Sequence, residues 1–64
     1  MKKYTPKNVI KILLKQGWIE RRVRGSHHIF TKEGENKIVV IPTSKKIIPT
    51  GTLKSIEKQS GIKF

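Results

Sequence analysis

The stretch that decides the fold is residues 18–41, WIERRVRGSHHIFTKEGENKIVVI. It is rich in β-branched residues and contains two turn signals, Gly25-Ser26 and the segment 33–36. Such a pattern predicts three strands that pair in antiparallel fashion through short connections. The expected strands are residues 18–24, 27–32 and 37–41, the last of which is stopped by Pro42.

Alternation along the first strand predicts which side chains share a face of the sheet. A regular strand would place Arg22 and Arg24 on the same face. The full expectation is Ile19, Arg21 and Val23 on one face, and Trp18, Glu20, Arg22 and Arg24 on the other. Trp18 is expected to pack in the core or between helix and strand, rather than to stack on a base.

A helix is predicted before the strands. Thr5 supplies a hydroxyl N-cap, and Pro6 is suited to the first helical position. Gly17 is expected to end the helix. Its apolar residues repeat at helical spacing, whereas lysines line the other side; the apolar set is Val9, Ile10, Leu13 and Leu14.

A second helix is predicted after the strands. Ile47-Ile48-Pro49 leads into it, Gly51 and Thr52 serve its start, and Gly61 stops it. Its inward-facing residues are expected to be Leu53, Ile56 and Ser60. The chain is therefore expected to be one α+β domain over residues 1–64, in the order α-β-β-β-α. Both helices would cover one face of a three-stranded antiparallel sheet, as in the double-stranded-RNA-binding domain, and leave the other face free.

The composition excludes several classes of protein. The chain has 64 residues, 34% of them hydrophobic, and no cysteine. This is enough for one thin core, and it excludes a disulfide framework, a thiolate zinc site and a cysteine nucleophile. No apolar run reaches the roughly 20 residues that a membrane helix needs. The N-terminal residues lack the apolar stretch of a signal peptide, so a cytoplasmic location without membrane attachment is expected.

The charge indicates a polyanionic partner. Fifteen Lys and Arg against four acidic residues give a net charge of +11. The run Arg21-Arg22-Val23-Arg24 strengthens this expectation, because arginine binds phosphate oxygens in bidentate fashion.

Two adjacent histidines, His27 and His28, are the candidates for proton transfer. Histidine can act as a general acid or base on a phosphodiester, with nearby cations holding the phosphate. All four acidic residues are glutamates, which makes a two-metal nuclease improbable, and no metal or other cofactor is expected. A metal-independent ribonuclease that uses the 2′-hydroxyl of RNA as its nucleophile fits the residues that remain. Neighbours on a regular strand point to opposite faces, so only one histidine would act unless a bulge re-aims the other.

Two other functions fit the same charge. The first is a non-catalytic double-stranded-RNA-binding module, which would need neither histidine. The second is a ribosome-associated or scaffold protein whose charge supports packing on ribosomal RNA. Salt-dependent binding without cleavage would favour the first, and cosedimentation with ribosomes the second.

The chain resembles the HicA family of mRNA-cleaving toxins over almost its whole length. The Gly-Ser-His triplet and the Gly-Thr-Leu segment at this separation are specific in combination. The resemblance lies in Gly17-Trp18, Val23-Arg24-Gly25-Ser26-His27-His28, Ile41-Pro42, the segment 49–56 and Gln59-Ser60-Gly61-Ile62.

This resemblance implies a double-stranded-RNA-binding-domain-like fold, ribosome-independent cleavage of mRNA and neutralisation by a HicB-type antitoxin. It assigns catalysis to His27. The adjacent His28 is our second candidate. The chain departs from many members in one respect, since Pro42-Thr43-Ser44 lacks a second histidine. The role of that histidine is either lost here or passes to Lys45 or Lys46. The expected RNA-binding residues are Arg22, Arg24, Gly25, Ser26, Lys45 and Lys46.

Overall fold

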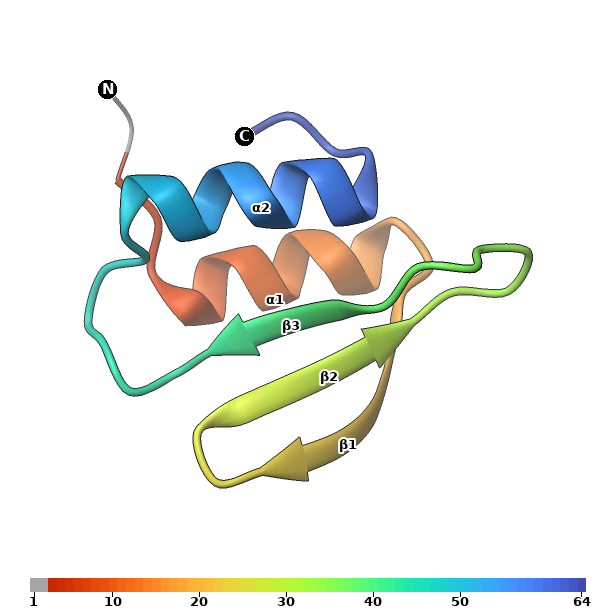
Figure 1. Ribbon diagram of the computed structural model, residues 1–64, viewed down its shortest axis with the longest axis horizontal. Coiled ribbons are helices and arrows are strands. Elements are labelled where there is room, and N and C mark those ends of the chain that lie inside the picture. Colours follow the sequence, from red (N-terminus) through yellow and green to blue (C-terminus); the bar gives the residue numbers. More distant parts are fainter. Residues whose placement is uncertain (1–2) are drawn as a thin grey trace.

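Five elements follow one another in the order predicted from the sequence. The computed structural model describes residues 3–64. The elements are α1 (Pro6–Lys15), β1 (Ile19–Arg24), β2 (His27–Thr31), β3 (Val39–Pro42) and α2 (Thr50–Ser60) (Figure 1). The α-β-β-β-α order and the α+β class are thus confirmed, whereas the likeness to the double-stranded-RNA-binding domain stays a prediction.

Helix α1 begins and ends as its sequence predicts. The backbone N–H of Asn8 donates to the Thr5 hydroxyl (3.1 Å), and Pro6 occupies the first turn, where no intrahelical N–H is needed. The helix gives way at Gln16 to Gly17. The predicted apolar face is too wide, since Leu14 is 53% exposed. Each residue advances a helix by about 100°, which turns Leu14 away from the core side on which its neighbour lies.

The sheet has the order β1-β2-β3, and both neighbouring pairs are antiparallel. The register between β1 and β2 shifts between Glu20 and Arg22, so Arg21 forms a bulge. A bulge adds one residue to its strand and reverses the alternation beyond it. The predicted faces of β1 are therefore wrong on the N-terminal side of the bulge: Glu20 does not share a face with Arg22, and Ile19 does.

Strand β3 is shorter at its start than predicted. Lys37 and Ile38 lie outside the strand, which begins at Val39 and includes Pro42. Ile38 is 51% exposed, whereas Val39 is fully buried. Proline has no backbone N–H to donate to a neighbouring strand. This donor is not required at the end of a strand, so Pro42 can form the last pair of β3.

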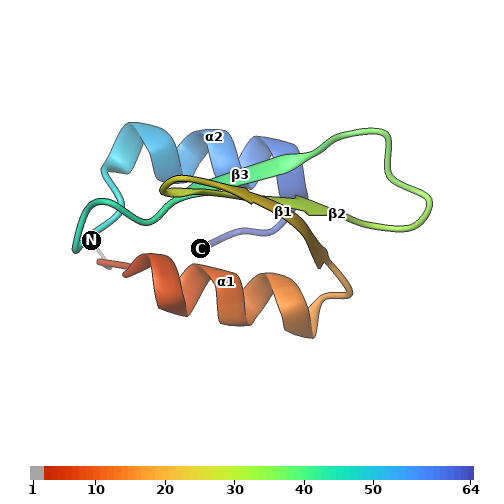
Figure 2. The ribbon, with the colours of Figure 1, turned by 90° about the horizontal axis from the view of Figure 1, so that it is seen from below.

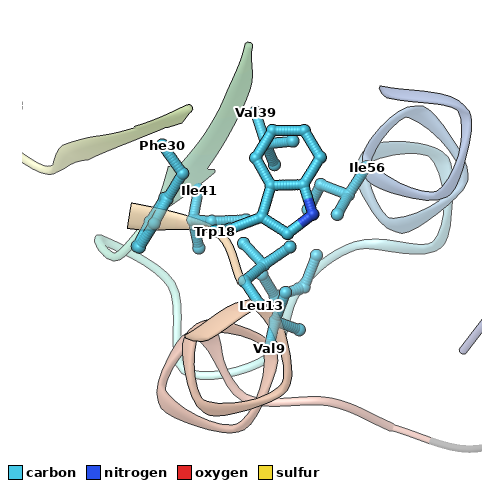
Figure 3. Packing of buried hydrophobic residues seen from close by; sticks show 8 residues of the cluster. Val9, Leu13, Trp18, Phe30, Val39, Ile41 and Ile56 are labelled. Atoms are coloured by element: carbon cyan, nitrogen blue, oxygen red, sulfur yellow. The ribbon is translucent and has the colours of Figure 1, made fainter. Parts of the chain in front are cut away.

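One hydrophobic core joins the sheet to both helices. Figure 3 shows Trp18 lying between the two helices and the sheet, and its side chain is 2% exposed. Its packing role is confirmed, although the indole Nε1 has no hydrogen-bond partner among the described residues. The buried cluster consists of Val9, Leu13, Trp18, Phe30, Val39, Ile41, Ile48 and Ile56.

Both helices contact β3 and contribute to this one cluster. Figure 2 shows α1 running across one side of the sheet and α2 alongside β3. Helix α2 turns Ile56 into the core, with Leu53 and Ser60 half-buried, and ends at Gly61 with φ +74°. All six residues of β1 are exposed, so the β1 side of the sheet stays open.

Candidate nucleic-acid interface

The two histidines lie on opposite faces of the sheet. Strand β2 pairs regularly with β3, with His27 opposite Pro42 and His28 opposite Ile41. Directly paired residues of antiparallel strands share a face. His28 is therefore on the face of the buried Ile41, whereas His27 is exposed on the other face. The bulge lies in β1 and leaves this alternation of β2 intact.

Arginines of β1 lie on the same open face as His27. Arg24 is directly opposite His27, and Arg22 is opposite Ile29, two residues further along β2. Both arginines are exposed. The predicted sharing of a face by Arg22 and Arg24 is confirmed. Their guanidinium groups can bind phosphate oxygens next to the imidazole.

Arg21 contributes differently from the other two arginines. Its Nε–H donates to the hydroxyl of Thr31, with a distance of 3.0 Å between Nε and Oγ1. This bond links the side chain of the bulged residue to the end of β2. Arg21 thereby adds positive charge beside Arg22. Its terminal guanidinium nitrogens have no hydrogen-bond partner among the described residues.

The turn that precedes His27 is fixed by a contact from the end of β3. Gly25 has φ +58°, a left-handed conformation that side-chain-bearing residues adopt at a cost. The carbonyl oxygen of Ser26 accepts from the backbone N–H of Thr43 (2.7 Å) and from its hydroxyl (2.9 Å). Figure 1 shows this turn and the end of β3 at the same end of the sheet. Gly25 and Ser26 therefore position His27, and Ser26 uses its backbone to do so.

The predicted lysines lie in the loop that this contact anchors. Lys45 and Lys46 are exposed, two and three residues beyond Thr43. The loop begins beside the Gly25-Ser26 turn because Thr43 holds Ser26 there. The structure gives neither lysine a hydrogen bond or ion pair with His27, so the two remain cations near one end of the interface.

His28 forms a hydrogen bond to Glu20 that the sequence did not predict. Its Nδ1 lies 2.6 Å from Oε1 of Glu20. An ionised carboxylate only accepts hydrogen bonds, so this nitrogen carries a proton and the Nε2 atom faces away from the pair. The side chains are 25% and 41% exposed, which places the pair at the rim of the helix-facing side. The bulge brings Glu20 to this face.

Two residues that contact the segment around the histidines escaped prediction from the sequence. Thr43 hydrogen-bonds to Ser26, which lies 17 positions earlier in the chain, and no local sequence pattern predicts such a contact. Glu20 contacts His28 because of the bulge in β1. The consecutive charged residues of β1 form no sequence pattern that predicts a bulge. Among residues 3–64, no group of three or more His, Asp or Glu side chains could hold a metal ion, and no helix is long and apolar enough to cross a membrane.

These features define a small basic α+β protein whose open sheet face carries exposed arginines and one exposed histidine. Residues 6–62 match the family described as the HicA toxin of bacterial toxin–antitoxin systems. The chain belongs to this family, so it is the toxin of a toxin–antitoxin pair and its partner is an antitoxin. No significant match was found among the curated proteins.

Proposed function

We propose that this toxin is a metal-independent endoribonuclease that cleaves mRNA in the cytoplasm and is neutralised by a HicB-type antitoxin. The 64 residues would form one RNA-binding and catalytic domain. The observation that carries the proposal is the position of His27, exposed on the open face of the sheet and directly opposite Arg24.

The reaction needs one phosphate held beside one imidazole. Arg22 and Arg24 would bind the non-bridging oxygens, and the charge that develops on them would be stabilised by these guanidinium groups. His27 would take the proton of the 2′-hydroxyl, whose oxygen attacks the adjacent phosphorus. The bond from phosphorus to the 5′-oxygen breaks, and this oxygen takes a proton. The products are a 2′,3′-cyclic phosphate and a 5′-hydroxyl.

A second proton-transfer group is not fixed beside His27. The positions just after Pro42, where many members of the family carry a second histidine, are Thr43 and Ser44 here. Lys45, Lys46 or water would protonate the leaving oxygen. A single positioned group supports a modest enzyme, since each such group contributes about 10²- to 10⁴-fold. Slow turnover is sufficient for a protein that stops growth.

His28 is the alternative catalyst because the Glu20 carboxylate contacts its Nδ1. A carboxylate on Nδ1 fixes the tautomer and orientation of an imidazole, as in general bases of hydrolases. However, His28 lies on the helix-facing side, away from Arg24, and is only 25% exposed. We therefore assign the proton transfer to His27 and treat the Glu20–His28 pair as structural.

A non-catalytic RNA-binding module is the second candidate function. The observation that favours it is that no other described residue hydrogen-bonds the ring of His27, so bound RNA alone would orient it. Such a module would bind RNA through the same arginines, and its binding would weaken steeply with salt.

The test uses purified toxin without antitoxin, in EDTA, with an RNA oligonucleotide and the same sequence as DNA. Cleavage of RNA alone, with cyclic phosphate ends, is the expected result, and a 2′-deoxy substitution at a mapped site should abolish cleavage there. Salt-sensitive RNA binding without any cleavage would establish the binding module instead. Cleavage of DNA would contradict the 2′-hydroxyl mechanism.

A further inference from the structure

A groove lies between α2 and the C-terminal segment 61–64, and it involves none of the residues of the open sheet face. Its volume is about 560 Å³, and most of its lining surface is apolar. Ile62, half-buried, contributes to this lining. Lys54, Lys58 and Lys63 surround it and are all exposed.

The lysines of this groove have no compensating ion pair in the part of the chain that the structure describes. Lys54 and Lys58 are one helical turn apart, where two like charges repel each other. Among residues 3–64, none of the three lysines forms an ion pair. The one acidic residue of the lining, Glu57, accepts a hydrogen bond from the backbone N–H of Phe64 (2.7 Å). The groove therefore keeps an excess of positive charge around an apolar floor.

We propose that this groove binds an acidic segment of the antitoxin that inserts an apolar side chain between the lysines. Carboxylates would pair with Lys54, Lys58 and Lys63, and the apolar side chain would contact Ile62. The inference rests on the antitoxin partner that the family implies and is independent of the nuclease activity. It gives the antitoxin an anchor on the helical side of the toxin, separate from the RNA-binding face.

An acidic protein segment fits this groove better than the other polyanions do. An RNA backbone has no aliphatic side chain to insert into an apolar hollow, and the residues that line the groove include no aromatic ring on which a base could stack. A second copy of this chain is disfavoured because each copy carries +11. Apolar surface rimmed by charge is typical of protein–protein interfaces.

The experiment compares two double variants with the same change of charge. Lys54→Glu/Lys58→Glu alters the groove, whereas Lys7→Glu/Lys37→Glu alters two exposed lysines outside it. Affinity for the cognate antitoxin, expressed from the gene paired with the toxin gene, is measured by titration calorimetry. Melting temperatures establish that each variant is folded. Lys54→Gln/Lys58→Gln provides a milder variant should the charge reversal disturb α2.

We expect the groove variant to bind antitoxin about tenfold or more weakly, since charge pairs at interfaces lose affinity on this scale when reversed. RNA cleavage by the free groove variant should stay within about twofold of wild type, as for surface substitutions remote from a site. Equal losses of antitoxin affinity in both double variants would overturn the proposal, because general charge would then explain them. Unchanged antitoxin affinity with weakened RNA binding would overturn it in favour of RNA as the occupant. If no toxin cleaves RNA, the affinity comparison still decides this inference.

Discussion

Arg24 lies directly opposite His27 at the turn end of the β1–β2 pair, so a guanidinium and an imidazole share the open face of the sheet. The pairing brings together a guanidinium suited to binding phosphate and an imidazole suited to proton transfer, which are three residues apart in the chain. The turn at Gly25-Ser26 makes this possible, because it reverses the chain between the two residues. We base the proposed catalytic role of His27 on this relationship.

Replacing Arg24 should weaken RNA binding and cleavage together. Arg24→Gln removes the charge, whereas Arg24→Lys keeps the charge but loses the bidentate fork. We expect the slope of log K against log salt to fall by about 0.7–0.9 in Arg24→Gln, the change for one lost phosphate contact. Arg24→Lys should retain the salt slope and still cleave more slowly. Filter binding at several salt concentrations measures both, and an unchanged slope in Arg24→Gln would exclude a phosphate contact.

The Glu20–His28 pair should contribute modestly to stability and not at all to cleavage. A double-mutant cycle with Glu20→Gln and His28→Gln is expected to give a coupling energy of about 0.2–1 kcal/mol, because both side chains are partly exposed and solvent screens the pair. Urea unfolding of the four proteins measures it. Both single variants should cleave RNA at wild-type rates. A loss of cleavage in His28→Gln that Glu20→Gln reproduces would instead identify this pair as the catalytic dyad.

Thr43 should support both the stability of the fold and the rate of cleavage through its hydroxyl as well as its backbone N–H. Thr43→Val keeps the β-branched shape but removes the hydroxyl that donates to Ser26, and it should destabilise the fold by about 0.5–1.5 kcal/mol. Thr43→Ser keeps the donor and should be closer to wild type. We expect Thr43→Val to slow cleavage more than Thr43→Ser does at a temperature where both are fully folded. Equal cleavage by the two would limit Thr43 to a role in stability.

Gly25 should resist substitution because of its backbone conformation. No heavy atom outside its own neighbourhood lies within 4 Å of an added Cβ, so the cost of Gly25→Ala comes from φ +58° alone. A left-handed residue with a side chain costs about 1–2 kcal/mol. Gly25→Asn should cost less than Gly25→Ala, since asparagine tolerates this region better. Thermal unfolding measures the order of the two, and the reverse order would show that space limits this turn.

The sequence was informative where local rules decide structure. Thr5-Pro6 and Gly61 mark helix ends through capping, and alternation along β2 correctly separates His27 from His28. The sequence was less informative where contacts between residues far apart in the chain determine the structure. The bulge at Arg21 depends on how β1 pairs with β2, and it moved Glu20 to the face of His28. The hydrogen bonds from Thr43 to Ser26 depend on tertiary packing, for which the sequence has no short-range pattern.

The most direct test of the central claim is the cleavage rate of one RNA oligonucleotide by wild type, His27→Gln and His28→Gln, each free of antitoxin and in EDTA. Our account predicts that His27→Gln loses about 10²- to 10⁴-fold in rate, as expected when a general acid–base group is removed. It also predicts that His28→Gln cleaves like wild type and that both variants still bind RNA. Equal cleavage by wild type and His27→Gln would contradict the account.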